Sequence, residues 1–290
     1  MRNAFRAMGT EIALLADDEQ DGRVFASAVA EVAAIFEREE QRFSRFRDDS
    51  ELASVNRAGG GWIDVSQPFA EVVALALDGA AATAGLFDPT VLHALEAAGY
   101  DRTFAEVRSG ARGSLRAVPC GRWREIEVRR GRIRLPEGVG LDLGGIAKGW
   151  TADRAAEAAA GAGLTWAIVN AGGDLRVAGD APALEVGVED PDDRAQHLCT
   201  VRIDGGALAT SSVTLRRWGP ERHHVIDPRI GLPARSPVVQ ATVWAPTCAA
   251  AEVAGTRALL EGMPALEELA GVLVLASGEV VTNLTTGAAA

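Results

Sequence analysis

Apolar residues recur every three to four positions in several long segments, a spacing that places them on one face of an α-helix. Early in the chain they include Val24, Ala28 and Val32. Four segments with this spacing are predicted as helices: 24–43, 68–84, 148–160 and 248–260. The second is expected to end at Gly85, because glycine commonly takes the left-handed conformation that caps a helix, and Phe87-Asp88-Pro89 is then a turn.

Alternation of apolar and polar residues predicts β-strands along much of the remaining chain. In residues 124–135 the alternation lies on both sides of Arg130-Gly131, which is typical of an antiparallel hairpin with one buried face. Other predicted strands are 11–16, 166–170, 184–188, 198–203, 223–227 and 238–244. Because strands often follow one another directly, we expect an α+β fold with a largely antiparallel sheet as its core and flanking helices.

Neither a repeat nor a linker divides the chain. No period of about 20 to 50 residues is visible, and no stretch rich in proline, glycine and serine separates two halves. We therefore expect one folding unit over residues 1–290, with two interlaced lobes as the alternative arrangement.

The composition is that of a globular protein with a large core. The 290 residues are 48% hydrophobic and 24% charged, and the formal net charge is −11. Binding to the phosphates of nucleic acids requires clustered positive charge, so an acidic chain of this kind is not expected to have a nucleic acid partner.

The sequence has no pattern that predicts a disulfide, a zinc site, a membrane span or a signal peptide. The cysteines, Cys120, Cys199 and Cys248, are odd in number and far apart, which predicts neither a disulfide framework nor a zinc site. No stretch approaches the roughly 20 apolar residues of a membrane span, and the first residues lack the apolar run of a signal peptide or a lipoprotein signal. A cytoplasmic location is therefore the expectation.

The segment 141–153, LDLGGIAKGWTAD, is the most informative one for chemistry. A predicted strand ends at Asp142, passes through Gly144-Gly145 and opens a helix near Lys148. Glycines allow close backbone approach, a helix N-terminus offers free N–H groups and the lysine adds positive charge, so the junction suits an anionic ligand such as a phosphate. An ordinary strand–turn–helix junction with an incidental lysine is the alternative.

Two further segments carry polar side chains with oxygen atoms at positions that suit a ligand or metal site. Asn170-Ala171-Gly172-Gly173-Asp174 follows a predicted strand, where sites are commonly built, although a plain tight turn explains it equally well. Glu252 and Thr256 are four residues apart in a predicted helix that Thr247 can cap, which places a carboxylate and a hydroxyl on one face. Such donors suit Mg²⁺ rather than Zn²⁺; purely local roles for both residues are the alternative.

Two adjacent histidines, His223 and His224, lie in the predicted strand 223–227. Alternation along a strand sends their side chains to opposite faces, so only one of them can face a given site. A histidine is a suitable base for removing a proton from a hydroxyl at neutral pH, and a histidine satisfied by hydrogen bonds within the sheet is the alternative.

Taken in order, these segments resemble the ApbE family of FAD:protein FMN transferases over almost the whole chain. Each matching segment is short, but their shared order and spacing make the match specific. The segments are Met8–Thr10, Phe43–Phe46, Ser50–Asn56, Phe87–Val91, Asp142–Gly149, Val169–Asp174, Ala209–Ser211, His224–Pro228 and Ala245–Thr256. The resemblance implies an ApbE-like α+β fold.

The resemblance also implies the residues of a site. FAD as the substrate would be bound by a set of residues of which several act through the backbone: Met8, Phe46, Leu86, Phe87, Asp88, Asp142, Lys148, Asp174 and Ile226. Mg²⁺ would be held by the Gly145 carbonyl, Glu252 and the Thr256 hydroxyl, and His224 would be the catalytic base. The reaction would transfer FMN to a Thr or Ser hydroxyl of an acceptor flavoprotein and release AMP.

The chain departs from the family pattern in two places. Glu252 stands where the family usually has Asp, which moves the carboxylate out by one methylene, and Gly255 beside it weakens the helix. Phe46 stands where Tyr is common, which keeps a ring for stacking on flavin or adenine and loses a hydroxyl. The alternative functions are a FAD pyrophosphatase that produces FMN and AMP with water as the acceptor, and a non-catalytic FAD-binding protein.

Overall fold

Two compact units make up the described part of the chain, which is residues 1–110 and 114–287 of a computed structural model. The first unit contains Met1–Arg38, Lys148–Thr214 and the chain from Ser236 onward, and the second contains Glu39–Ala147 and Leu215–Arg235. Each unit is therefore assembled from segments that are far apart in the sequence. The single domain expected over residues 1–290 stays a prediction.

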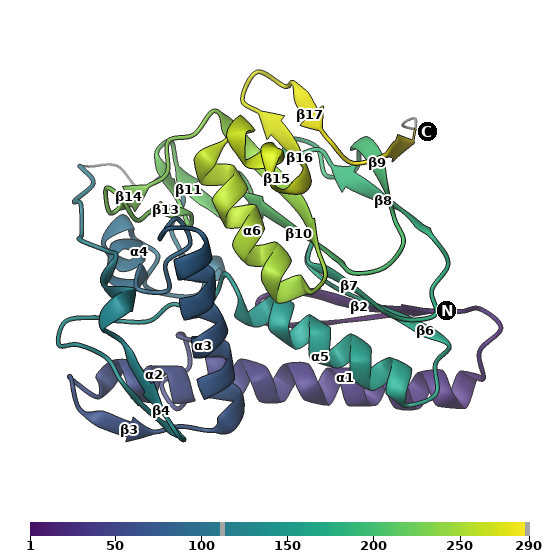
Figure 1. Ribbon diagram of the computed structural model, residues 1–290, viewed down its shortest axis with the longest axis horizontal. Helices are drawn as coiled ribbons and strands as arrows, with labels where there is room; N and C mark the ends of the chain where they lie inside the picture. Colours follow the sequence, from purple (N-terminus) through teal and green to yellow (C-terminus); the bar gives the residue numbers. More distant parts are fainter. Residues whose placement is uncertain (111–113, 288–290) are drawn as a thin grey trace. The chain divides into compact units, whose positions relative to one another are not determined.

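An eight-stranded antiparallel sheet forms the centre of the first unit (Figure 1). Its strands lie in the order β1-β2-β6-β7-β10-β15-β16-β17, and every neighbouring pair is antiparallel. They are β1 (Arg2–Ala7), β2 (Thr10–Ala16), β6 (Trp166–Ala171), β7 (Leu175–Gly179), β10 (Ala207–Ser212), β15 (Val238–Ala245), β16 (Ala270–Leu275) and β17 (Val280–Thr282). The predicted α+β fold with a largely antiparallel sheet is confirmed.

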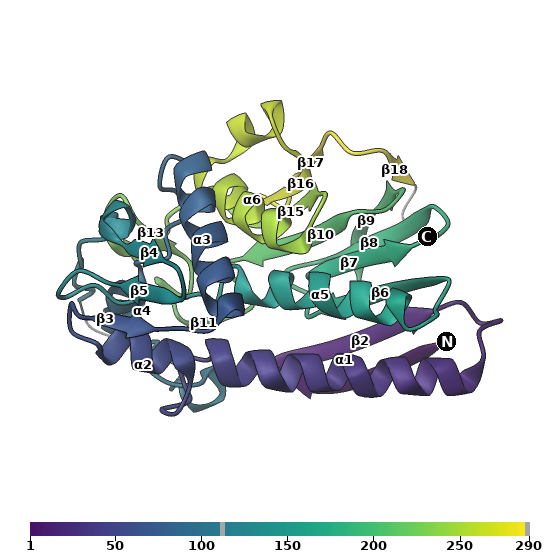
Figure 2. The same ribbon diagram turned by 60° about the horizontal axis from the view of Figure 1, so that its bottom comes forward.

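Alternate residues of the central strands face two different layers, because successive side chains of a strand point to opposite faces. In β6, Ala167 and Val169 pack in one core with helices α1 (Gly22–Phe43), α5 (Ala147–Gly161) and α6 (Cys248–Glu261). Ile168, between them in sequence, packs in a second core with a small sheet of β18 (Thr286–Gly287), β9 (His197–Ile203) and β8 (Leu184–Glu189). Figure 2 shows α1, α5 and α6 lying along the same face of the large sheet.

Short helices and three small sheets form the second unit. The helices are α2 (Glu51–Arg57), α3 (Gln67–Ala82) and α4 (Leu92–Ala98). The sheets are β3 (Trp62–Asp64) with β5 (Arg132–Arg134) and β4 (Glu127–Arg129), β11 (Arg217–Gly219) with β12 (Arg222–His223), and β13 (Ile226–Asp227) with β14 (Leu232–Pro233). Ser50 and Ser66 cap α2 and α3 by accepting hydrogen bonds from main-chain N–H groups. An apolar cluster that includes Tyr100 and Trp218 joins α4 to β11 and β13.

Most predicted elements are present with small differences at their ends. All four predicted helices exist, and the hairpin around Arg130-Gly131 is formed by β4 and β5. That hairpin is shorter than predicted because Arg124 and Glu125 belong to a 3₁₀ turn, Arg122–Glu125. Among the helices of residues 1–110 and 114–287, none has the length and apolar character that crossing a membrane requires.

Two predicted strands are wrong. Residues 223–227 do not form one strand, because β12 ends at His223 and β13 begins only at Ile226. The segment before Gly144 is not a strand either, since its backbone bonds to other partners. The Asn56 side chain exchanges two hydrogen bonds with the Leu141 backbone at 2.8 and 2.9 Å, and the Asp142 N–H donates to the Pro89 carbonyl at 2.9 Å.

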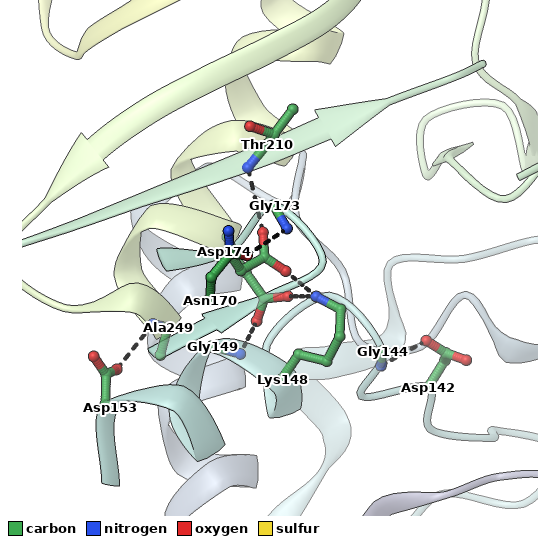
Figure 3. A network of polar contacts seen from close by, with 11 residues as sticks. Asp142, Gly144, Lys148, Gly149, Asp153, Asn170, Gly173, Asp174, Thr210 and Ala249 are labelled. Atoms are coloured by element: carbon green, nitrogen blue, oxygen red, sulfur yellow. Dashed lines mark hydrogen bonds and ion pairs between the residues drawn. The ribbon is translucent and has the colours of Figure 1, made fainter. Parts of the chain in front are cut away.

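Helices α5 and α6 approach closely near their N-terminal ends. Asp153 of α5 accepts hydrogen bonds from the N–H groups of Cys248 (2.8 Å) and Ala249 (3.1 Å), which no residue within α6 can satisfy. Figure 3 shows the bond to Ala249. A Cβ atom on Gly149 would lie only 2.7 Å from the Cys248 carbonyl oxygen and from Glu252 Oε2. The approach of the two helices therefore requires glycine at this position.

We expect Gly149→Ala to lower the free energy of unfolding by about 1–3 kcal/mol, because the added methyl group meets the backbone of α6 rather than a movable side chain. Gly161→Ala is the matched control, since Gly161 ends the same helix and a Cβ there meets nothing within 4 Å. The control should change stability by less than about 1 kcal/mol. Urea unfolding measures both, and equal stability of the two variants would contradict the close-approach argument.

Candidate functional site

A buried cluster of three charged side chains lies in the first unit, where the beginning of α5, the turn after β6 and helix α6 meet. The Lys148 ammonium donates to the Asp174 carboxylate, as Figure 3 shows, and to Glu252 Oε1 at 2.6 Å. Glu252 Oε2 accepts a hydrogen bond from the Gly149 N–H at 2.7 Å. Both carboxylates are buried. The Gly149 N–H in the first turn of α5 thus bonds to a carboxylate of the protein itself, and the anionic ligand expected at this junction stays a prediction.

The cluster contains two acids and one lysine, so its formal charges do not cancel when both acids are ionised. Burial opposes the charged form of Lys148, but Asp174 and Glu252 outweigh that effect and hold the Lys148 pKa above its usual range. Burial raises the pKa of Glu252, Lys148 offsets part of the rise, and Asp174 adds to it. With both acids ionised the cluster has a formal charge of −1, which favours the arrival of a further cation.

Asp174 is positioned by the glycine turn that joins β6 to β7. Gly172 and Gly173 both have positive φ, at 67° and 105°, and a Cβ atom on Gly172 would overlap the Thr10 side chain. The Asn170 side chain accepts the Gly173 N–H at 2.9 Å, and the Thr210 N–H of β10 donates to Asp174 Oδ1 at 3.3 Å (Figure 3). The turn therefore directs the Asp174 carboxylate to Lys148.

The residues expected to hold Mg²⁺ are distributed over both units. Glu252 and Thr256 are one turn apart on α6 in the first unit, while Gly145 belongs to the second. No group of three His, Cys, Asp or Glu side chains in residues 1–110 and 114–287 is arranged as a metal site. The expected donors are a carboxylate, a hydroxyl and a carbonyl, all of them oxygen atoms of the kind Mg²⁺ prefers, and the net negative charge beside Glu252 also suits a cation.

Gly255, which the sequence suggests as a weak point of α6, has a packing role. A Cβ atom there would be 3.1 Å from the Ser211 hydroxyl and 3.7 Å from the Ala209 carbonyl oxygen, both on β10. The glycine thus lets α6 lie directly on the strand that also supplies the Thr210 N–H to Asp174. Its helix propensity is low, but a larger residue would move Glu252 away from the sheet.

In the second unit, Phe87 and Asp88 of the loop after α3, which are expected to bind FAD, form hydrogen bonds with nearby residues of the protein. Asp88 Oδ1 accepts hydrogen bonds from the Thr90 N–H (2.8 Å) and hydroxyl (2.6 Å), and Oδ2 accepts the Gly121 N–H (2.6 Å). The Phe87 N–H donates to the Thr83 hydroxyl at 3.0 Å. Both oxygens of the Asp88 carboxylate therefore accept hydrogen bonds within the protein, which leaves mainly backbone atoms of the loop Leu86–Asp88 for a ligand.

Phe46, Asp142 and Ile226 of the second unit are linked through residues that the sequence did not single out. Asp142 Oδ2 accepts from Arg45 Nε at 2.8 Å, and the Arg45 guanidinium lies over the Phe46 ring. The Phe46 ring in turn lies 5.6 Å from that of Tyr100, which shares the apolar cluster with Ile226. Arg45 stands within the motif Phe43–Phe46, so the motif itself pointed to this position.

The two histidines differ in burial and in the hydrogen bonds that they make. His223 is buried, its Nδ1 accepts the Val225 N–H at 3.3 Å, and its Nε2 lies 3.1 Å from the Ala234 carbonyl oxygen. This pattern requires the neutral ring with its proton on Nε2. His224, the expected base, is half-buried in the bend after β12, and its N–H donates to the Arg216 carbonyl at 3.3 Å. The break of the predicted strand, rather than alternation, gives the two rings different surroundings.

Met8, the remaining expected FAD residue, lies in the tight turn between β1 and β2 of the first unit. Its φ is 49°, a left-handed conformation that is uncommon for a residue other than glycine, and Gly9 follows with a φ of 71°. The side chain packs partly against the helix-facing core. Such local strain is often found where a residue has a role beyond folding.

Comparison with known proteins gives a family and a fold. A model of the ApbE family matches residues 8–275. The FAD:protein FMN transferase of Treponema pallidum is 29% identical over 262 residues, which cover 81% of this chain and 72% of that protein. The corresponding transferase of Rhodobacter capsulatus is 31% identical over 222 residues, 73% of this chain but only 42% of that protein. The crystal structure of the ApbE protein of Thermotoga maritima has a TM-score of 0.84 at 24% identity, covering 97% of this chain and 96% of that one.

We expect Lys148→Met to lower the free energy of unfolding by about 3–5 kcal/mol, because it leaves two buried carboxylates without their cation. The double variant Lys148→Met/Glu252→Gln should recover part of this loss, since one of the two charges is then absent. Arg132→Met, which removes an exposed ion pair with Asp64, is the control and should change stability by less than about 1 kcal/mol. A Lys148→Met protein as stable as the control would contradict the proposed charge balance.

His223 should make the protein less stable in acid. Burial lowers its pKa below the ordinary value of 6.5, so the unfolded chain binds a proton that the folded protein does not. The contribution of neutral His223 to the free energy of unfolding is complete above pH 6.5 and is lost as the pH falls below that value. The free energy of unfolding then decreases by at most about 1.4 kcal/mol per pH unit. Urea unfolding at several pH values should show this slope in the unaltered protein and in His93→Gln, an exposed control, and a smaller slope in His223→Gln.

Proposed function

The chain belongs to the ApbE family, and we propose that it transfers the FMN part of FAD to a Thr or Ser hydroxyl of an acceptor flavoprotein, releasing AMP. The relatives named FAD:protein FMN transferase support this activity. The observation that carries the proposal is the Lys148–Asp174–Glu252 cluster, because three separate family segments, 142–149, 169–174 and 245–256, meet in it through buried charges.

The proposed reaction breaks one bond of the phosphoanhydride and forms one ester bond. The acceptor hydroxyl oxygen attacks the FMN phosphorus, and the bond from that phosphorus to the bridging oxygen breaks, so that AMP leaves with the bridging oxygen. The proton of the hydroxyl passes to a base, for which we propose His224. Catalysis of this kind depends mainly on positioning and on neutralising the phosphate oxygens.

We propose Mg²⁺ as the cofactor, with the Gly145 carbonyl, Glu252 and the Thr256 hydroxyl as its ligands. When bound, Mg²⁺ supplies positive charge to the diphosphate oxygens and to the leaving AMP. The oxygen donors and the net negative charge of the cluster support the choice of ion. Glu252 already accepts bonds from Lys148 and Gly149, so this carboxylate has to be shared between the protein and the ion.

For FAD itself we propose a set of binding residues, some of which act by contact and some through their charge: Met8, Phe46, Leu86, Phe87, Asp88, Asp142, Lys148, Asp174 and Ile226. The bonding within the loop supports a backbone role for Leu86–Asp88. The exposed ring of Phe46 supports stacking. Lys148 and Asp174 act through the electrostatics of their cluster, because their charged atoms are bonded to each other.

A non-catalytic FAD-binding protein is the second candidate, and one observation favours it. Both carboxylate oxygens of Glu252 are occupied by hydrogen bonds inside the protein. A family member in which the usual aspartate is replaced by this longer residue would bind Mg²⁺ less well if the internal bonds persisted. FAD would then bind and remain intact.

The test is incubation of the purified chain with FAD, Mg²⁺ and candidate acceptor flavoproteins. We expect AMP in solution and an acceptor that is fluorescent in a denaturing gel and heavier by the mass of FMN less one water. His224→Ala should reduce both by at least about 100-fold, since general base catalysis contributes about 10²–10⁴-fold. Chelation of the metal ion should abolish both, and added Mg²⁺ should restore them.

Each remaining outcome selects one alternative. AMP released without any labelled acceptor identifies a FAD pyrophosphatase, with water as the nucleophile. FAD that binds and stays intact identifies a binding protein. His223→Gln is the control for the histidine substitution, because both ring nitrogens of His223 already form hydrogen bonds with the backbone of Val225 and Ala234. A His224→Ala protein with full activity would contradict the choice of base.

A further inference from the structure

Arg45 is a buried cation of the second unit to which the proposed site gives no role. Its side chain is 8% exposed, and its Nε donates to Asp142 Oδ2 at 2.8 Å. Its Cζ atom lies 4.2 Å from the centre of the Phe46 ring and 4.4 Å from that of Tyr100. The guanidinium therefore has a carboxylate at one edge and lies over the faces of two aromatic rings.

One donor of this guanidinium has no acceptor among the described residues. Nη2 of Arg45 is buried and makes no hydrogen bond there. Burying an N–H group without an acceptor is unfavourable, and native proteins rarely leave one in that state unless a ligand, ion or water completes it. The bond from Nε to Asp142 and the two ring contacts hold the group in place, so Nη2 is a positioned donor that an acceptor on a ligand can complete.

The surroundings of Nη2 indicate the chemistry of that acceptor. Phe46 is 36% exposed, whereas Tyr100 is buried and has Trp218 and Phe104 as further aromatic neighbours. Phe46 thus offers a ring surface on which a planar group can stack. The Arg45 guanidinium lies over the face of the same ring, so a planar group that shares this face with it has its edge toward the guanidinium.

The ion pair with Asp142 argues against a phosphate as the partner of Arg45. Asp142 balances the guanidinium charge, and its own position is fixed, because Oδ1 accepts the Gly144 N–H at 2.9 Å. A phosphate beside this pair would meet a nearby carboxylate as well as the arginine. An uncharged acceptor, such as a ring nitrogen or a ring carbonyl oxygen, avoids that repulsion.

The geometry points to Arg45 as a ligand-binding residue: its Nη2 donates to an acceptor on the edge of a heteroaromatic ring that stacks on Phe46. The inference rests on the proposed function, since FAD supplies two such rings, isoalloxazine and adenine, and both carry edge acceptors. Asp142 then acts as a positioning residue that orients the guanidinium. The experiment decides which ring is bound.

The test compares FAD binding by the unaltered chain and by Arg45→Lys. A lysine can pair with Asp142 but cannot at the same time place a second donor at the position of Nη2. We expect the dissociation constant for FAD to rise about tenfold, the loss of one charge-assisted hydrogen bond. Competition experiments with FMN and with AMP locate the contact. In Arg45→Lys the dissociation constant of one of these fragments should also rise about tenfold, and that of the other should not change.

Arg129→Lys is the matched control. Arg129 also lies over an aromatic ring, Trp62 at 4.6 Å, and pairs with a carboxylate, Glu127 at 3.1 Å, but it is 70% exposed. This variant should bind FAD as the unaltered chain does. The melting temperatures of the two variants should be similar, so that the change in affinity is not a change in stability.

Three results would overturn the inference. If Arg45→Lys binds FAD with unchanged affinity, Nη2 does not contact the ligand. If FMN and AMP are weakened equally, the substitution distorts the unit as a whole. If the unaltered chain does not bind FAD, the proposed function fails and this inference fails with it. That result is seen without any substitution, so it is distinguishable from the other two.

Discussion

The burial of three charges in one place is the constraint on which the first unit depends. Ionised groups taken out of water are stable only when opposite charges and backbone donors surround them. Lys148 has two carboxylates, and Glu252 has Lys148 together with the N–H of Gly149. Because these groups come from distant segments, the cluster forms only when α5, α6 and the β6–β7 turn are all in place.

Close approach of backbone explains why glycines recur around this cluster. Gly149 allows α5 to meet α6, Gly172 allows the β6–β7 turn to pass Thr10, and Gly255 allows α6 to lie on β10. A side chain at Gly149 or Gly255 would separate α6 from an element that carries another group of the cluster, and one at Gly172 would displace the turn that carries Asp174. The glycines are therefore a geometric requirement of the site as well as of the turns.

The sequence predicted the sheet and the long helices, because periodicity is a local property. The segments 142–149, 169–174 and 245–256 do meet in the charged cluster, while their role as a FAD and Mg²⁺ site stays a prediction. The sequence did not predict that Glu252 would bond to Gly149 and Lys148, since that contact joins residues more than a hundred positions apart. It also missed Arg45, whose importance appears only when Asp142 and Tyr100 lie beside it. The strand expected over 223–227 failed because alternation alone does not show whether a neighbouring strand is present to pair with it.

The discontinuous make-up of the units has a consequence for biosynthesis. In the first unit, strand β10 lies between β7 and β15, and helix α6, which covers this part of the sheet, follows β15 in the chain. A growing polypeptide on the ribosome therefore presents Ala207 and Ala209 of β10, which pack in the same core as α6, without this cover until α6 has been made. Apolar surface exposed in this way makes an unfinished chain prone to aggregate.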